Sequence, residues 1–97
     1  MLTFEKLQTE YRPLIIAIVQ KYGAGDIRVF GSFVHGEQKP ESDIDFLVKL
    51  GPETTLLQLA AMERELKELL KHEIDIVSES GISKYLKDTI LSEAVVL

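Results

Sequence analysis

The sequence contains no cysteine, which excludes disulfide bonds and thiolate metal sites. It also lacks an excess of basic residues, since 11 Lys and Arg stand against 16 Asp and Glu and the formal net charge is −5. This balance argues against strong electrostatic binding to the phosphate backbone of a nucleic acid, so no direct nucleic-acid binding is expected. An acidic chain is better suited to a metal-dependent site or to a basic protein partner.

Long apolar runs are absent as well. The longest one, residues 14–19, is far too short to span a bilayer, and the N-terminus has no basic segment followed by an apolar run. We therefore expect no membrane association and a cytoplasmic location. No repeat, low-complexity segment or linker is visible, so residues 1–97 are expected to form a single domain with one core.

The spacing of apolar residues predicts alternating helices and strands. Helices are predicted over residues 3–22, 54–71 and 83–93, and strands over residues 26–30, 43–50 and 73–77. Pro13 is expected to kink the first helix or to divide it, because proline lacks the N–H and clashes with the preceding turn. One helical turn is expected at 33–36, followed by a polar loop at 37–41. The apolar tail, residues 94–97, is expected either to dock on the domain or to meet a partner.

The connections between these elements predict the topology. The first two strands are expected to be antiparallel, and the helix at 54–71 suits a right-handed crossover to a parallel third strand. The predicted fold is α/β (α+β), with a small three-stranded mixed sheet, helices packed on one face and the order α-β-(turn)-β-α-β-α.

The most informative stretch runs from Gly31 to Asp45 and reads GSFVHGEQKPESDID. Asp43 and Asp45 are two residues apart, so on a strand they project from the same face. Carboxylates held that close repel each other, and a hard cation such as Mg²⁺, which prefers oxygen ligands, removes that cost. The Gly31-Ser32 turn offers backbone N–H groups and a hydroxyl, which suit phosphate oxygens. Together these features indicate a site for a metal-bound nucleoside triphosphate.

Asp75 lies in the middle of the third predicted strand, and the parallel crossover would bring it beside Asp45. Each feature also has a simpler interpretation. A lone Asp-x-Asp is usually a pair of solvated carboxylates, Asp75 can be a solubilising charge on an edge strand, and His35 can be a polar turn residue. His72, at the end of a helix, is better explained by a favourable interaction with the helix dipole than as a ligand.

The Gly-Ser pair, ten intervening residues and Asp-x-Asp resemble the signature of the DNA-polymerase-β-type nucleotidyltransferases. The whole chain, including its final stretch KYLKDTILSEAVVL, is similar to minimal nucleotidyltransferases of the MNT antitoxin kind. This resemblance implies a nucleotidyltransferase fold in which Asp43, Asp45 and Asp75 are catalytic and hold two Mg²⁺ ions. It also implies that Gly31 and Ser32 bind the β- and γ-phosphates of ATP.

The resemblance further implies transfer of AMP from ATP to a hydroxyl, that of a tyrosine, on a HEPN-type RNase toxin. Two alternatives stay open: a non-catalytic antitoxin that neutralises its toxin by binding, and a small-molecule nucleotidyltransferase. One residue departs from the pattern, because the family often has arginine where this sequence has His35. Histidine is shorter and only partly charged near neutral pH, so His35 is expected to hold the nucleotide less firmly.

Overall fold

The computed structural model describes residues 2–36 and 42–97, and its elements follow the predicted order. They are α1 (Phe4–Gln8), α2 (Arg12–Lys21), β1 (Ala24–Phe30), α3 (Ser32–His35), β2 (Ile44–Leu50), α4 (Leu56–Leu70), β3 (Ile74–Ser78), the short 3-10 turn η1 (Glu79–Gly81), α5 (Lys84–Glu93) and β4 (Val95–Val96). The polar loop predicted at 37–41 lies outside the described residues.

The strands form one mixed sheet in the order β3-β2-β1-β4. As the sequence predicts, β1 and β2 are antiparallel, and β2 and β3 are parallel. A fourth strand was not predicted: the two residues of β4 pair antiparallel with Arg28 and Val29 of β1. The sheet therefore has four strands instead of three, and β3 and β4 lie at its two edges.

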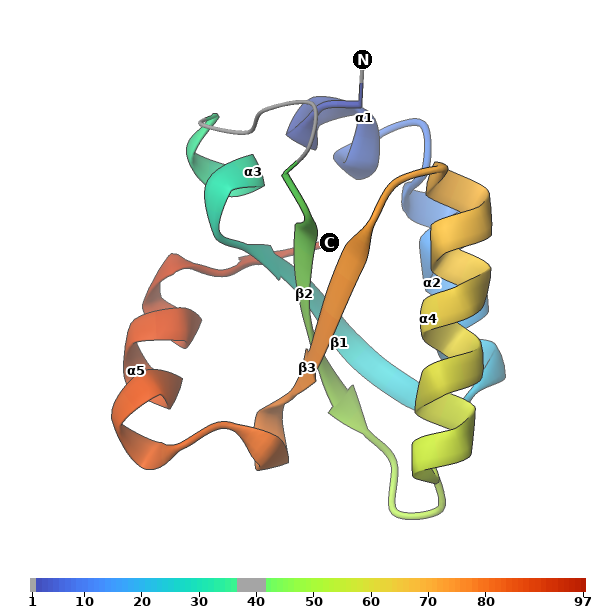
Figure 1. Ribbon diagram of the computed structural model, residues 1–97, viewed down its shortest axis with the longest axis vertical. Coiled ribbons are helices and arrows are strands. Elements are labelled where there is room, and N and C mark those ends of the chain that lie inside the picture. Colours follow the sequence, from blue (N-terminus) through green and yellow to red (C-terminus); the bar gives the residue numbers. More distant parts are fainter. Residues whose placement is uncertain (1, 37–41) are drawn as a thin grey trace.

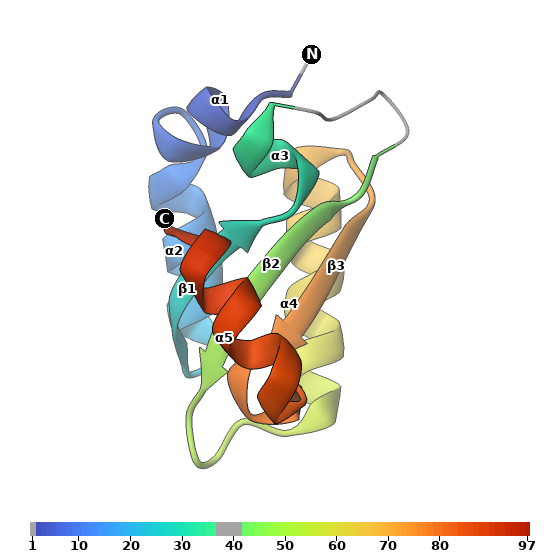
Figure 2. The same cartoon turned by 90° about the vertical axis from the view of Figure 1, so that its left-hand side faces the viewer.

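The helices occupy both sides of this sheet. Figures 1 and 2 show α2 and α4 against one face and α5 in front of the other. The sequence predicted helices on one face only. Because α5 connects β3 to β4 at opposite edges, it has to cross the sheet, and α2 and α4 already fill the first face. None of the described helices combines the length and the apolar character needed to cross a membrane.

The predicted first helix is divided into α1 and α2, close to the proline that was expected to interrupt it. Pro13 lies in the first turn of α2, where its missing N–H leaves no helical hydrogen bond unmade. Thr3 caps α1 by accepting a hydrogen bond from the Lys6 N–H. Proline thus starts the second helix, and the break falls just before it.

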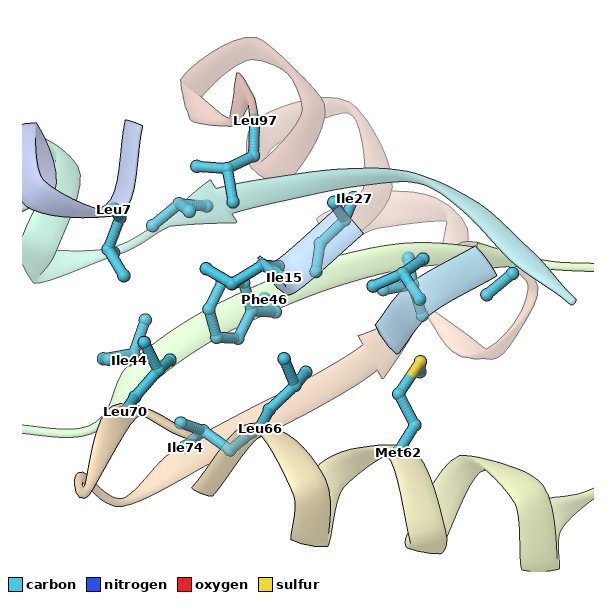
Figure 3. Packing of buried hydrophobic residues seen from close by; sticks show 14 of the residues in the cluster. Leu7, Ile15, Ile27, Ile44, Phe46, Met62, Leu66, Leu70, Ile74 and Leu97 are labelled. Atoms are coloured by element: carbon cyan, nitrogen blue, oxygen red, sulfur yellow. The ribbon is translucent and has the colours of Figure 1, made fainter. Parts of the chain in front are cut away.

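The core lies between the sheet and the pair α2 and α4 (Figure 3). The buried stripe of α4 consists of Met62, Leu66 and Leu70. They face alternate residues of the central strand, Ile44 and Phe46, both with 0% of their surface exposed. Full burial of one such side chain is worth about 1.5–3 kcal/mol, so packing on this side of the sheet contributes strongly to the stability of the fold.

The apolar tail docks on the domain. Leu97 is buried in the core cluster, its N–H donates to the Ile27 carbonyl at 3.0 Å, and its main-chain oxygen accepts from Arg12 Nε at 2.6 Å. Of the two outcomes expected for residues 94–97, the structure supports docking, which closes the edge of β1 beside α2.

Candidate nucleotide and metal site

Asp45 stands at the centre of the candidate site because of how its strand is paired. In the antiparallel register Asp45 lies opposite Phe30, the last residue of β1, and in the parallel register it lies opposite Asp75 of β3. Gly31 and Ser32 follow Phe30 directly and begin α3. Three segments far apart in the sequence therefore meet at one end of the sheet.

The three carboxylates differ in their surroundings. Asp45 is half-buried, whereas Asp43 and Asp75 are exposed. Burial raises the pKa of Asp45, and the negative charges of Asp75 and then Asp43 raise it further. The parallel register independently places Asp75 beside Asp45. Asp43 precedes β2 instead of lying within it. The strand alternation that would put Asp43 and Asp45 on one face therefore does not extend to Asp43.

Within the ranges 2–36 and 42–97, no three His, Cys, Asp or Glu side chains are arranged to hold one metal ion. Repulsion between like charges keeps unpaired carboxylates apart, which is consistent with the raised pKa of Asp45. The donor chemistry itself fits Mg²⁺, because all three groups are carboxylates. A cation between them would offset the repulsion that now acts on Asp45.

Gly31 is required by both its backbone and its surroundings. Its φ of 80° and ψ of −152° belong to a region that is essentially restricted to glycine. A Cβ at this position would overlap Asp45 Oδ2. The turn and the central aspartate are thus in direct contact, and only a residue without a side chain allows that approach.

His35 ends α3, and its Nε2 lies 3.9 Å from Glu93 Oε2 at the end of α5. Both side chains are 47% exposed, so water screens this ion pair and it contributes little stability. The contact links α3 to α5.

Sequence analysis missed the role of His72. Its Nε2 lies 2.5 Å from the Ser42 carbonyl oxygen, and its ring meets Phe33 edge-on with centroids 5.5 Å apart. Ser42 immediately precedes Asp43, and Phe33 lies in α3, the helix that follows Gly31. His72 therefore contacts both the segment that carries the aspartates and the helix after the turn. No local pattern could have indicated this, because the hydrogen bond joins residues 30 positions apart.

Replacing Gly31 by alanine tests the close approach of the turn to Asp45. We expect Gly31→Ala to lower the free energy of unfolding by about 2–3 kcal/mol, since it adds both backbone strain and an overlap. Gly36→Ala is the matched control, because Gly36 has φ 68° but no described atom within 4 Å of the point that a Cβ would occupy. Chemical denaturation measures both variants. Equal losses would mean that Asp45 does not restrict this position.

A second prediction concerns the stability of the metal-free protein. The raised pKa of Asp45 means that the folded state binds a proton more tightly than the unfolded state, whose value is near 3.8. Stability is therefore lost as the pH rises from there through the folded pKa of Asp45. We expect Asp45→Asn to unfold at a higher temperature than the wild type at pH 7, and the gap to close below about pH 3.

The control for this experiment is Asp88→Asn, which changes an exposed carboxylate on α5. Thermal unfolding without metal, followed from pH 3 to pH 7, compares the two variants. A marked loss of stability in Asp45→Asn at pH 7 would contradict the account, since it would mean that the Asp45 carboxylate is needed to hold the fold together.

Comparison with known proteins identifies the family to which the chain belongs. A model of the nucleotidyltransferase domain matches residues 13–97. The chain is 43% identical over 86 residues to "Putative protein adenylyltransferase MJ0435" of Methanocaldococcus jannaschii, covering 89% of this chain and 92% of that protein. It is 34% identical over 95 residues to "Protein adenylyltransferase MntA" of Thermococcus cleftensis, covering 98% and 96%.

Solved structures agree. One described as "Structure of putative minimal nucleotidyltransferase" superposes with a TM-score of 0.89 at 36% identity, covering 99% of this chain and 97% of that one. The fold alone is shared with an MNT antitoxin solved in complex with a tri-AMPylated HEPN toxin of Shewanella oneidensis, with a TM-score of 0.70, 19% identity, and 92% and 70% of the two chains covered. By sequence and by fold, the chain belongs to the nucleotidyltransferase domain family, among its minimal nucleotidyltransferases.

Proposed function

We propose that this protein is a Mg²⁺-dependent protein adenylyltransferase, which transfers AMP from ATP to a hydroxyl of a partner protein. One observation carries the proposal: the strand register brings Asp45 beside Asp75 on one side and, on the other, beside Phe30, the residue before the Gly31-Ser32 turn. A phosphate-binding turn, a metal-binding pair and a candidate base are thereby adjacent.

The nucleotide is bound at the turn. Gly31 lies in direct contact with Asp45, so phosphate oxygens that accept from the backbone N–H groups of the turn would lie beside this carboxylate, and the Ser32 hydroxyl adds a donor. His35, one turn further on, supplies a further donor when it leaves Glu93. Imidazole gives a weaker hold on phosphate than the forked guanidinium of arginine.

Asp43, Asp45 and Asp75 are the residues that would hold two Mg²⁺ ions. When bound, such ions neutralise the phosphates and stabilise the entering and leaving oxygens of an in-line displacement. The carboxylates present the hard oxygen ligands that this cation prefers. Their mutual repulsion in the metal-free protein is the cost that binding would relieve.

In the reaction, the partner's hydroxyl gives its proton to the Asp75 carboxylate as its oxygen bonds to the α-phosphorus of ATP. The bond from that phosphorus to the bridging oxygen breaks at the same time, and pyrophosphate leaves. Asp75 is exposed on an edge strand, so a large acceptor can reach it. Positioning and electrostatics provide most of the rate enhancement in such transfers.

The acceptor we propose is a tyrosine of a cognate HEPN-type toxin, in the cytoplasm, where ATP is available. The names of the relatives support protein adenylylation, and the shared fold with a toxin-bound antitoxin supports this partner. The net charge of −5 suits a basic, RNA-binding protein.

A second candidate function is neutralisation of the toxin by binding alone. The histidine at position 35, where the family often has arginine, favours it, because imidazole holds phosphate less firmly than a guanidinium. Transfer and occlusion make opposite predictions about the mass of the partner.

The test is co-expression and purification with the small helical protein encoded beside this one. Incubation with ATP and Mg²⁺ should increase the partner's intact mass by about 329 Da for each AMP, the group left when pyrophosphate departs. Asp75→Asn should abolish this increase by removing the base, while the complex persists in a pull-down. Asp88→Asn, with an exposed carboxylate on α5, is the control that should transfer normally. A stable wild-type complex without any mass increase would leave only the occlusion hypothesis.

A further inference from the structure

A pocket lies on the sheet, apart from the candidate site and toward the other end of β2. It has a volume of about 320 Å³ and lies between the end of β2, η1 and α5, lined by Lys49, Leu50, Glu79, Ser80 and Lys87. Lys49 follows Asp45 by four residues on β2, so the two side chains leave the same face of the sheet. At 3.3 Å per residue, about 13 Å separate them.

The charge of this pocket is opposite to that of the protein. Both Lys49 and Lys87 are exposed. In the described part of the chain, neither of them forms an ion pair within 4.0 Å. Glu79 lines the same pocket, so two positive charges stand against one negative charge. In a chain with a net charge of −5, this is a local excess of unpaired positive charge.

The pocket lies on the same side of β2 as Asp75, the residue proposed to accept the proton of the acceptor's hydroxyl. Glu79 and Ser80 directly follow β3, the edge strand that carries Asp75, and Glu79 is four positions after Asp75 in the sequence. The phosphates, in contrast, are assigned to the Gly31-Ser32 turn after β1, on the other side of β2. A protein whose hydroxyl reaches Asp75 along the edge of β3 therefore passes next to the pocket.

We propose that this pocket binds a carboxylate side chain of the acceptor protein, at a point four residues, or about 13 Å, along β2 from Asp45. The inference rests on the proposed function. The two ammonium groups and the Ser80 hydroxyl donate to the carboxylate, and Leu50 packs against its methylene groups. Because Glu79 leaves a net charge of only one unit, the pocket matches a single carboxylate better than a dianionic phosphate.

Charge reversal tests this proposal. Lys49→Glu and Lys87→Glu should each raise the KM for the partner protein about tenfold and leave kcat within about twofold, since a charge at the rim of an interface acts on association. The affinity for ATP with Mg²⁺, measured by calorimetry, should not change. The KM of the wild type should also rise with NaCl concentration more steeply than that of either variant.

The matched control is Arg64→Glu, which makes the same change of charge at an exposed position of α4, the helix on the opposite face of the sheet (Figure 2). An equal rise in KM for this control, or no rise for the lysine variants, would overturn the proposal. Weaker ATP binding by the lysine variants would also overturn it, because the pocket would then belong to the nucleotide.

Thermal melting of each variant establishes that it is folded, and Lys49→Gln, which removes the charge without reversing it, should have an intermediate effect. If the wild type transfers no AMP, the proposed function fails. The pocket is then tested by the partner's dissociation constant alone, which the lysine variants should raise about tenfold and Arg64→Glu should not.

Discussion

The pairing of β2 with a strand on each side is the constraint on which the site depends. Its antiparallel register with β1 places Asp45 beside the residue that precedes the Gly31-Ser32 turn, and its parallel register with β3 places Asp45 beside Asp75. A shift of either register by one residue would turn Asp45 into the core and Phe46 out of it. The hydrophobic alternation that folds β2 therefore also positions the chemistry of this minimal nucleotidyltransferase.

The two faces of the sheet perform different tasks. On the side of α2 and α4, fully buried side chains such as Phe46 and Leu66 provide stability. The candidate site contains two features that cost stability. Asp45 has a raised pKa, and Gly31 has a backbone conformation that suits only glycine. Sites of this kind are stabilised by the rest of the fold and by their ligands.

Much of this arrangement could be predicted from the sequence, because periodicity is local. The alternation in residues 44–50 predicted β2, the stripe through Met62 predicted α4, and the length of the crossover predicted that β3 is parallel. Contacts that join distant residues carry no such signal. The two-residue strand β4 is too short for a periodic pattern, and the hydrogen bond between His72 and Ser42 depends on the completed fold. The side of the sheet on which α5 lies follows from β4, so it could not be predicted either.

The central claim is that the aspartates and the turn form one site for a metal-bound nucleotide. Thermal melting with Mg²⁺ and ATP tests it most directly, because a ligand that binds only the folded state raises the melting temperature. We predict an increase for the wild type that disappears when EDTA replaces Mg²⁺, and no increase for the double variant Asp43→Asn with Asp45→Asn. An unchanged increase in that double variant would contradict the account.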